Sequence, residues 1–137
     1  MATWDDVRRI ALGLPDVAET RPGEWRAPRG LVVWERPLRK ADLEFLGDDA
    51  PTGPILGART PDVETQQALV TEEPEVFFVT PHFHGYPGVL VLLDAIDADR
   101  LEELVVEAWS TRVPAKVAGP VVAERARLAR ERADRGP

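Results

Sequence analysis

The segment Gly88–Leu93 constrains the fold more than any other part of the chain. It reads Gly-Val-Leu-Val-Leu-Leu, with no alternation between apolar and polar residues. A strand with one face in water alternates, so an unbroken apolar run is typical of a strand that is covered on both faces or buried at one end. We therefore expect a central strand here. Residues 75–80, which are rich in β-branched and aromatic side chains, predict a second strand just before it.

Two amphipathic patterns predict helices that pack on this sheet. Asp97 opens the first helix, whose apolar residues recur at i, i+3, i+4, i+7 and i+8. These residues are Leu101, Leu104, Val105, Ala108 and Trp109. The second helix is expected from Thr3, which forms a variant of the capping box with Asp6, to Leu14, where Gly13 and Pro15 end the pattern.

The remaining segments complete an α+β pattern. Residues 25–27 and 31–36 predict a hairpin around the turn Pro28-Arg29-Gly30, and residues 54–59 predict a short strand. Thr60-Pro61 predicts the start of a helix that reaches residue 72 or 73. A mainly antiparallel sheet with helices packed against it is the expected fold class.

The end of the chain is expected to hold one more helix. Pro114 and Gly119-Pro120 predict interruptions, after which a helix runs from about Val121 to Asp134. Residues 120–137 are thus interpreted as a C-terminal helix with a tail that frays beyond Arg132.

Length and composition favour one intracellular domain. A chain of 137 residues is long enough for one hydrophobic core, so residues 1–137 are interpreted as a single domain. The absence of cysteine excludes disulfides, thiolate metal sites and a cysteine nucleophile, and it suits a reducing cytoplasm. The N-terminus is acidic, and no apolar run approaches the roughly 20 residues that a membrane span requires. We expect a cytoplasmic protein without a membrane partner.

Charge is distributed unevenly along the chain, although the net charge is -7. Residues 21–40 carry six basic and two acidic side chains, residues 41–110 carry two basic and fifteen acidic ones, and residues 111–137 carry seven basic and three acidic ones. Net acidity argues against a phosphate-rich partner unless the basic groups form a local surface. Ordinary solvated faces are the alternative interpretation.

The segment Thr80–Pro87 contains both histidines and the only tyrosine of the chain. His82 and His84 are spaced for two imidazoles to share a metal, but a third ligand is missing, so no metal site is assigned. The same histidines and Tyr86 are the only local candidates for acid–base chemistry. No nucleophile elbow and no Gly-rich phosphate loop accompany them. We assign no catalytic residue and no cofactor, and we retain the three side chains as candidates for a ligand pocket.

Four segments, in their order and spacing, resemble the MmcQ/YjbR-like family of small bacterial proteins. They are Leu12–Val17 with Glu19, Trp25-Arg26, Phe77–Pro87, and Glu107–Trp109 leading to Val113–Lys116. The resemblance implies a CyaY-like α+β fold and nucleic-acid binding through wing-like β elements, and it implies no established enzymatic activity or cofactor.

The resemblance and the charge pattern together favour a non-enzymatic protein that binds nucleic acid, with DNA as the expected partner, through the arginine-bearing hairpin. Trp25 or Trp34 would support this wing. The candidate contact residues are Arg26, Arg29, Arg36, Arg39 and Lys40, and the C-terminal arginines could assist. Two alternatives remain: a small-ligand or enzyme site around His82, His84 and Tyr86, and a protein-interaction module.

Overall fold

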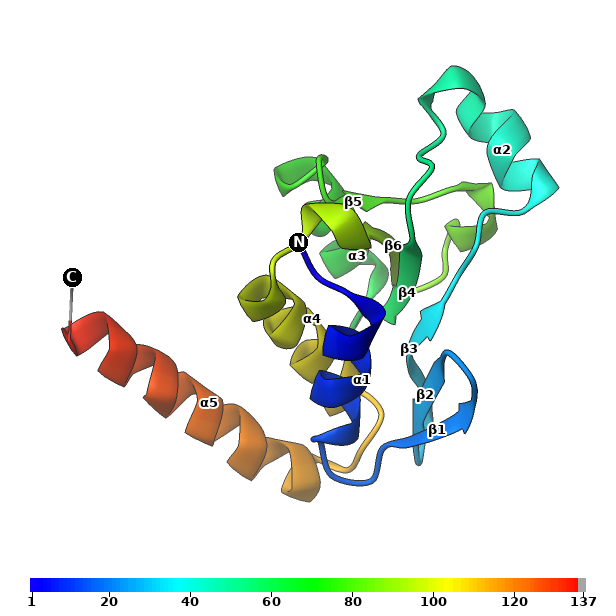
Figure 1. The fold of residues 1–137 in the computed structure, drawn as a ribbon. Coiled ribbons are helices and arrows are strands. Elements are labelled where there is room, and N and C mark those ends of the chain that lie inside the picture. The colour runs from blue at the N-terminus through cyan, green and yellow to red at the C-terminus, as the bar shows by residue number, and fades with distance from the viewer. Residues whose placement is uncertain (136–137) are drawn as a thin grey trace.

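Within residues 1–135, the sheet is antiparallel throughout and has six strands (Figure 1). The computed structural model describes residues 1–135. The strands stand side by side in the order β1-β2-β3-β4-β6-β5. Their bounds are β1 (Ala18–Arg21), β2 (Glu24–Ala27), β3 (Gly30–Glu35), β4 (Ile55–Arg59), β5 (Phe77–Phe78) and β6 (Gly88–Leu92). The predicted α+β class with an antiparallel sheet is confirmed, and β1 is an additional strand that the sequence pattern does not predict.

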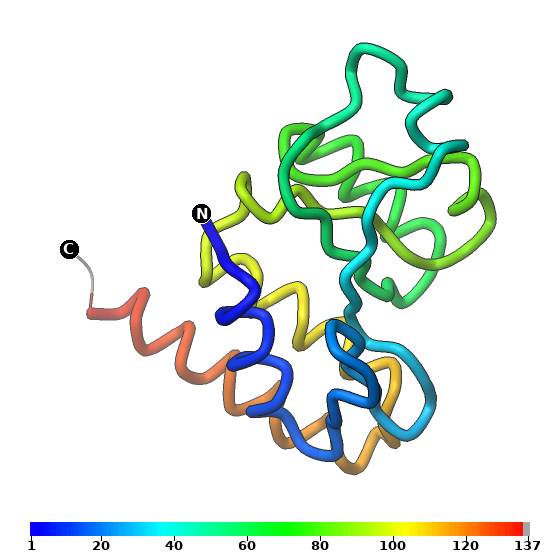
Figure 2. The backbone as a smooth tube through the Cα atoms, turned by 45° about the vertical axis from the view of Figure 1, so that its right-hand side comes forward, coloured from blue at the N-terminus to red at the C-terminus, as the bar shows by residue number. Residues whose placement is uncertain are grey.

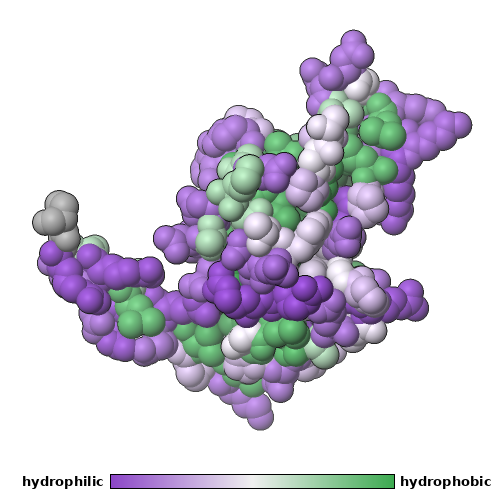
Figure 3. Space-filling model, in the orientation of Figure 1, coloured by the Kyte–Doolittle hydropathy of each residue, from purple (hydrophilic) through white to green (hydrophobic). Residues whose placement is uncertain are grey.

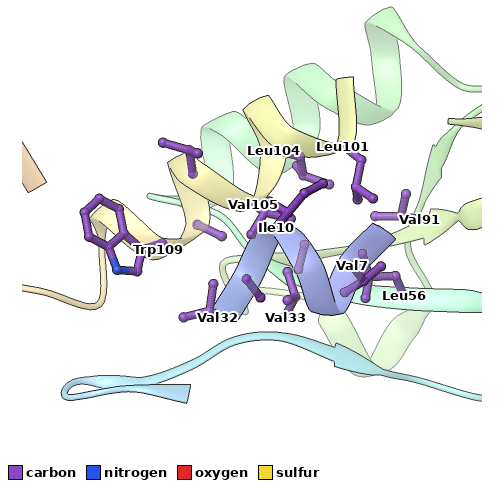
Figure 4. Packing of buried hydrophobic residues seen from close by; sticks show 14 of the residues in the cluster. Val7, Ile10, Val32, Val33, Leu56, Val91, Leu101, Leu104, Val105 and Trp109 are labelled. Carbon is purple, nitrogen blue, oxygen red and sulfur yellow. The ribbon is translucent and has the colours of Figure 1, made fainter. Parts of the chain in front are cut away.

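Helices cover one face of the sheet. The α-helices are α1 (Trp4–Leu12), α2 (Lys40–Leu46), α3 (Val63–Glu72), α4 (Ala98–Ser110) and α5 (Ala115–Arg135). Figure 4 shows side chains of α1 and α4, such as Val7 and Leu104, packed with side chains of the sheet, such as Val33 and Leu56. Thr3 and Asp6 form the predicted capping box of α1.

The apolar segment that predicted a central strand forms β6, between β4 and β5. Val89 and Val91 belong to the main core beneath the helices, whereas Leu90 packs with Ile55 and Phe83 in a second cluster. Successive side chains of a strand point to opposite faces, so both faces of β6 are covered. This explains why the segment does not alternate between apolar and polar residues.

The last helix differs from its prediction. α5 begins at Ala115 and continues through Pro120, so the predicted interruption at Gly119-Pro120 is wrong. Pro120 removes the hydrogen bond to the carbonyl of Lys116, but both residues are exposed, so water can serve that carbonyl. The helix extends to Arg135, and the final part of the predicted frayed tail, residues 136–137, lies outside the described residues.

Two helical segments extend away from the core. α5 starts beside the end of the molecule that holds β1, β2 and β3 and runs away from it, as Figures 1 and 2 both show. The segment that holds α2 projects from the opposite end of β3. Figure 3 shows apolar side chains on this projecting segment, where Leu43 is 47% and Phe45 is 60% exposed. Within residues 1–135, no helix combines the length and apolarity needed to cross a membrane.

Candidate functional site

Arg36 is a buried residue, which corrects its prediction as a nucleic-acid contact. Its side chain is 5% exposed, and its Nη1 lies 3.0 Å from Oδ2 of Asp42 and donates a hydrogen bond to the carbonyl of Pro37. The guanidinium also lies over the ring of Phe83, with 5.7 Å between Cζ and the ring centroid. A side chain enclosed in this way cannot contact an external phosphate, so Arg36 anchors the segment that follows β3.

Asp42 is the partner that holds Arg36 in place. Burial by itself would raise the pKa of Asp42. The backbone N–H of Arg39, which donates to Asp42 at 2.9 Å, and the Arg36 guanidinium help to outweigh this effect and hold the pKa below its ordinary value of 3.8. Asp42 therefore stays ionised, and the pair fastens α2 to the sheet.

The other predicted contact residues do not form one patch. Arg26 lies on β2, where it pairs with Glu24 at 3.8 Å, and Arg29 is exposed in the turn between β2 and β3. Arg39 and Lys40 are exposed at the start of α2. The six residues of β3 separate these two locations by roughly 20 Å.

Of the two tryptophans predicted to support the hairpin wing, only one is exposed enough to contact a ligand. Trp25 is 1% exposed and belongs to the main core, so it cannot stack on a base. Trp34 is half-buried and lies directly over Gly57, where an added Cβ would come within 2.3 Å of the indole ring. Trp34 is thus the tryptophan of the hairpin that is open to solvent.

The C-terminal arginines lie away from the hairpin. Arg125 pairs with Glu102 of α4, with 2.5 Å between Nη1 and Oε2, and Arg127 pairs with both Glu124 and Glu131. Because α5 runs away from the hairpin, its arginine-rich second half does not extend the hairpin surface (Figure 2). The arginines of α5 and those of the hairpin therefore lie on separate surfaces.

The structure instead places Arg29 beside two arginines that sequence reasoning missed, Arg59 and Arg112; we call these three the arginine cluster. The backbone N–H of Arg29 donates to the carbonyl of Arg112 at 3.0 Å, and Nη1 of Arg112 donates to the carbonyl of Arg29 at 3.1 Å. Arg59, the last residue of β4, lies over the ring of Tyr86, with 5.3 Å between Cζ and the ring centroid.

No local signal marks these two arginines as partners of the hairpin. Arg59 is one of only two basic residues in the acidic stretch 41–110, and Arg112 follows α4. Antiparallel pairing puts Arg59, at the end of β4, beside the first half of β3, and the connection between α4 and α5 brings Arg112 to the turn before β3, where it bonds to Arg29.

The Thr80–Pro87 segment covers the face of the sheet opposite α1 and α4. Phe83 is 2% exposed and fills the second apolar cluster, whereas His82 and His84 are exposed and Tyr86 is 37% exposed. Of the described residues, no group of three or more histidines, cysteines or acids is arranged to hold a metal ion.

Gln66 of α3 holds this segment, and it is a third residue that sequence reasoning missed. Its Nε2 donates to the carbonyls of Phe83, Tyr86 and Gly88 at 3.2, 2.7 and 2.6 Å. Neither imidazole of the segment has a hydrogen-bond partner within residues 1–135, so Gln66 and not the histidines holds the segment. The sequence around a buried glutamine of a helix does not predict which carbonyls its side chain will bind.

Two hollows lie elsewhere on the molecule. The larger, about 660 Å³, runs between α4 and α5, where Val106, Leu128 and Ala129 line it together with charged side chains. The smaller, about 220 Å³, lies between Trp4 and the segment around Pro54. Neither is lined by the two histidines or Tyr86, so neither supports the predicted ligand pocket.

Comparison with known proteins gives relatives in mycobacteria. No family model matches the chain. It is 53% identical over 117 residues to the uncharacterized protein Rv2570 of Mycobacterium tuberculosis (strain H37Rv), covering 83% of this chain and 91% of the relative. The uncharacterized protein Mb2600 of Mycobacterium bovis matches to the same extent.

One solved structure has a similar fold. It is the crystal structure of the Deinococcus radiodurans protein DR2400, which carries the domain DUF419. The TM-score is 0.58 at 21% sequence identity, and the match covers 80% of this chain and 77% of the other. At this identity the similarity establishes the fold and nothing further.

Proposed function

The chain belongs to the family of the mycobacterial protein Rv2570, and from this premise we propose that it is a non-enzymatic protein that binds nucleic acid at the turn between β2 and β3. We assign the family to the MmcQ/YjbR group. The sequence resemblance carries this assignment, and the fold agrees with it, because the solved structure of similar fold holds a DUF419 domain and DUF419 is the MmcQ/YjbR family.

The arginine cluster is the observation that carries the proposal. Within residues 1–135, no carboxylate forms an ion pair with Arg29, Arg59 or Arg112, although the chain has 24 acidic side chains. Phosphates of nucleic acid are bound by such local groups of basic side chains, even when the net charge is negative. Arg26 lies on the adjacent strand and is a further contact, whereas Arg39 and Lys40 would be reached only by a longer ligand.

DNA binding at this site has a defined salt dependence. With about three phosphate contacts, raising the salt from about 50 mM to about 200 mM is expected to weaken duplex binding roughly 40-fold. Fluorescence anisotropy with labelled duplex and single-stranded DNA measures this effect. If the protein binds neither DNA at the lower salt concentration, the proposal is refuted.

A matched pair of variants locates the interface. Arg29→Glu reverses one charge in the cluster and is expected to weaken binding by at least about tenfold. Arg130→Glu makes the same change on the exposed second half of α5 and is expected to leave the affinity within about twofold. Equal losses from the two variants would mean that the protein binds DNA through general charge and not at the hairpin turn.

The exposed apolar side chains of α2 support a second candidate, a protein-interaction module. Leu43 and Phe45 lie on the projecting segment, and exposed apolar groups of this kind are common at partner surfaces (Figure 3). Affinity capture from lysate with the wild type and a Phe45→Ser variant separates the two functions. A protein retained only by the wild type favours this candidate, and retained DNA favours the first.

A further inference from the structure

The arginine cluster combines a lack of acidic partners, within residues 1–135, with contacts between distant parts of the chain. Other arginines that bridge distant parts of the chain meet carboxylates, as Arg8 meets Glu19 at 2.9 Å and Arg100 meets Glu73 at 2.6 Å. The three arginines of the cluster come from three separate parts of the chain. The Arg112 guanidinium bonds to the backbone of Arg29, and the charge of Arg59 is near enough to lower the pKa of Arg112. Such an arrangement leaves a concentrated positive charge that an anion would neutralise.

The charged form of Arg112 is destabilised by this arrangement. Burial, followed by the positive charges of Arg59 and Arg29, lowers the pKa of the Arg112 guanidinium, while Tyr86 acts in the opposite direction. Nη1 of Arg112 is occupied by the carbonyl of Arg29, and Nε donates to the hydroxyl of Thr111 at 3.2 Å. These bonds fix the guanidinium without neutralising its charge.

Arg59 is held in position by stacking. Its guanidinium lies over the Tyr86 ring, and its Nε is buried with no hydrogen-bond partner in the described part of the chain. Gly88 makes room for the ring, because a Cβ there would lie 2.7 Å from Cε2 of Tyr86. Stacking occupies the face of a guanidinium and leaves its N–H groups available to an acceptor.

We propose that Arg29, Arg59 and Arg112, together with Tyr86, form a binding site for a single phosphate group. Three guanidinium groups match the charge and the several oxygens of a phosphate better than those of a carboxylate, which has one charge and two oxygens. The phosphate site shares its arginines with the proposed nucleic-acid function and rests on it only in that respect. A free phosphate or a phosphate monoester could occupy the site without being part of a nucleic acid.

Titration with inorganic phosphate tests the site directly. Calorimetry at constant ionic strength, with chloride replacing phosphate in the reference, is expected to give a Kd below about 1 mM. Arg59→Met removes the charge but keeps an apolar side chain against Tyr86, so it is expected to fold normally and to bind phosphate at least about tenfold more weakly. Arg130→Met is the matched control and is expected to bind like the wild type. No phosphate binding by the wild type, or unchanged binding by Arg59→Met, would overturn the site.

A second experiment separates the sources of the phosphate and the two proposals. Short single-stranded oligonucleotides with and without a 5′-phosphate are compared, and a site for monoesters predicts tighter binding of the phosphorylated one. If inorganic phosphate binds and neither oligonucleotide does, the phosphate site stands and the nucleic-acid function fails. If both oligonucleotides bind equally and inorganic phosphate does not, the nucleic-acid function stands and the phosphate site is refuted.

Discussion

The ion pair between Arg36 and Asp42 offers the sharpest test of how this fold is held together. Both side chains are almost fully buried, at 5% and 4% exposed, and their closest atoms are 3.0 Å apart. Arg36→Met removes the positive partner and leaves a buried carboxylate that keeps only weaker partners. Breaking a buried pair in this way costs about 3–5 kcal/mol. The hydrogen bond from the Arg39 N–H to Asp42 remains, so we expect Arg36→Met to lower the free energy of unfolding by about 3 kcal/mol.

Urea denaturation followed by circular dichroism measures this loss, and a double-mutant cycle assigns it to the pair. A loss of about 3 kcal/mol is a large part of the roughly 5–15 kcal/mol that stabilises a typical domain. Asp42→Leu is expected to cost a similar amount, because it leaves the Arg36 charge unpaired. The double variant should cost less than either single change, with a coupling energy above about 2 kcal/mol. Single losses below about 1 kcal/mol, or simple additivity, would refute the reasoning.

The pair also predicts how stability depends on pH. The folded-state pKa of Asp42 lies below its ordinary value of 3.8, so its contribution is fully present above that value and is lost as the pH falls through the lower folded-state pKa. Asp42→Asn should therefore be clearly less stable than the wild type near about pH 6, and the difference should shrink near about pH 3. A difference that does not change with pH would show that the ionised carboxylate contributes nothing.

Three further substitutions test other features of the structure. Gln66→Leu removes the side-chain donor shared by three carbonyls, of which those of Phe83 and Tyr86 keep backbone donors, and should cost about 2 kcal/mol in urea denaturation. It should also speed amide exchange in residues 81–88, and unchanged exchange would count against its role. Gly57→Ala should cost about 1–3 kcal/mol and change the tryptophan fluorescence, because the new Cβ displaces the Trp34 ring. Asp97→Ala removes the N-cap of α4 and should lower the stability measured by thermal unfolding by about 1 kcal/mol. No loss would mean that the cap does not contribute to the stability of the fold.

Local sequence patterns and residue types predicted most helices and strands of the fold. The capping box at Thr3, the stripe from Leu101 to Trp109 and the unbroken apolar run of β6 each depend on residues that are near neighbours in the chain. The prediction failed at Pro120, where a proline that usually interrupts a helix is tolerated because its turn is exposed. Exposure of that turn is a property of the folded molecule.

The candidate site was predicted only in part, because charge along the sequence does not show where a side chain points. Arg29 and Tyr86 were identified as candidates, and both belong to the proposed phosphate site. Arg36 was grouped with Arg29, but folding buries it against Asp42. Arg59 stood in an acidic stretch and gave no signal, yet strand pairing places it over Tyr86.

The sequence by itself determined the fold class, the uneven distribution of charge and most of the secondary structure, with β1 and the start of α5 as exceptions, since these follow from periodicity and composition over short stretches. Only the tertiary structure decided which arginines are neutralised and which are not. Burial and pairing depend on groups brought together from distant parts of the chain, as Arg29 of the turn between β2 and β3 meets Arg112 of the connection between α4 and α5. The surface on which a function can be proposed is therefore a product of packing and not of any one segment.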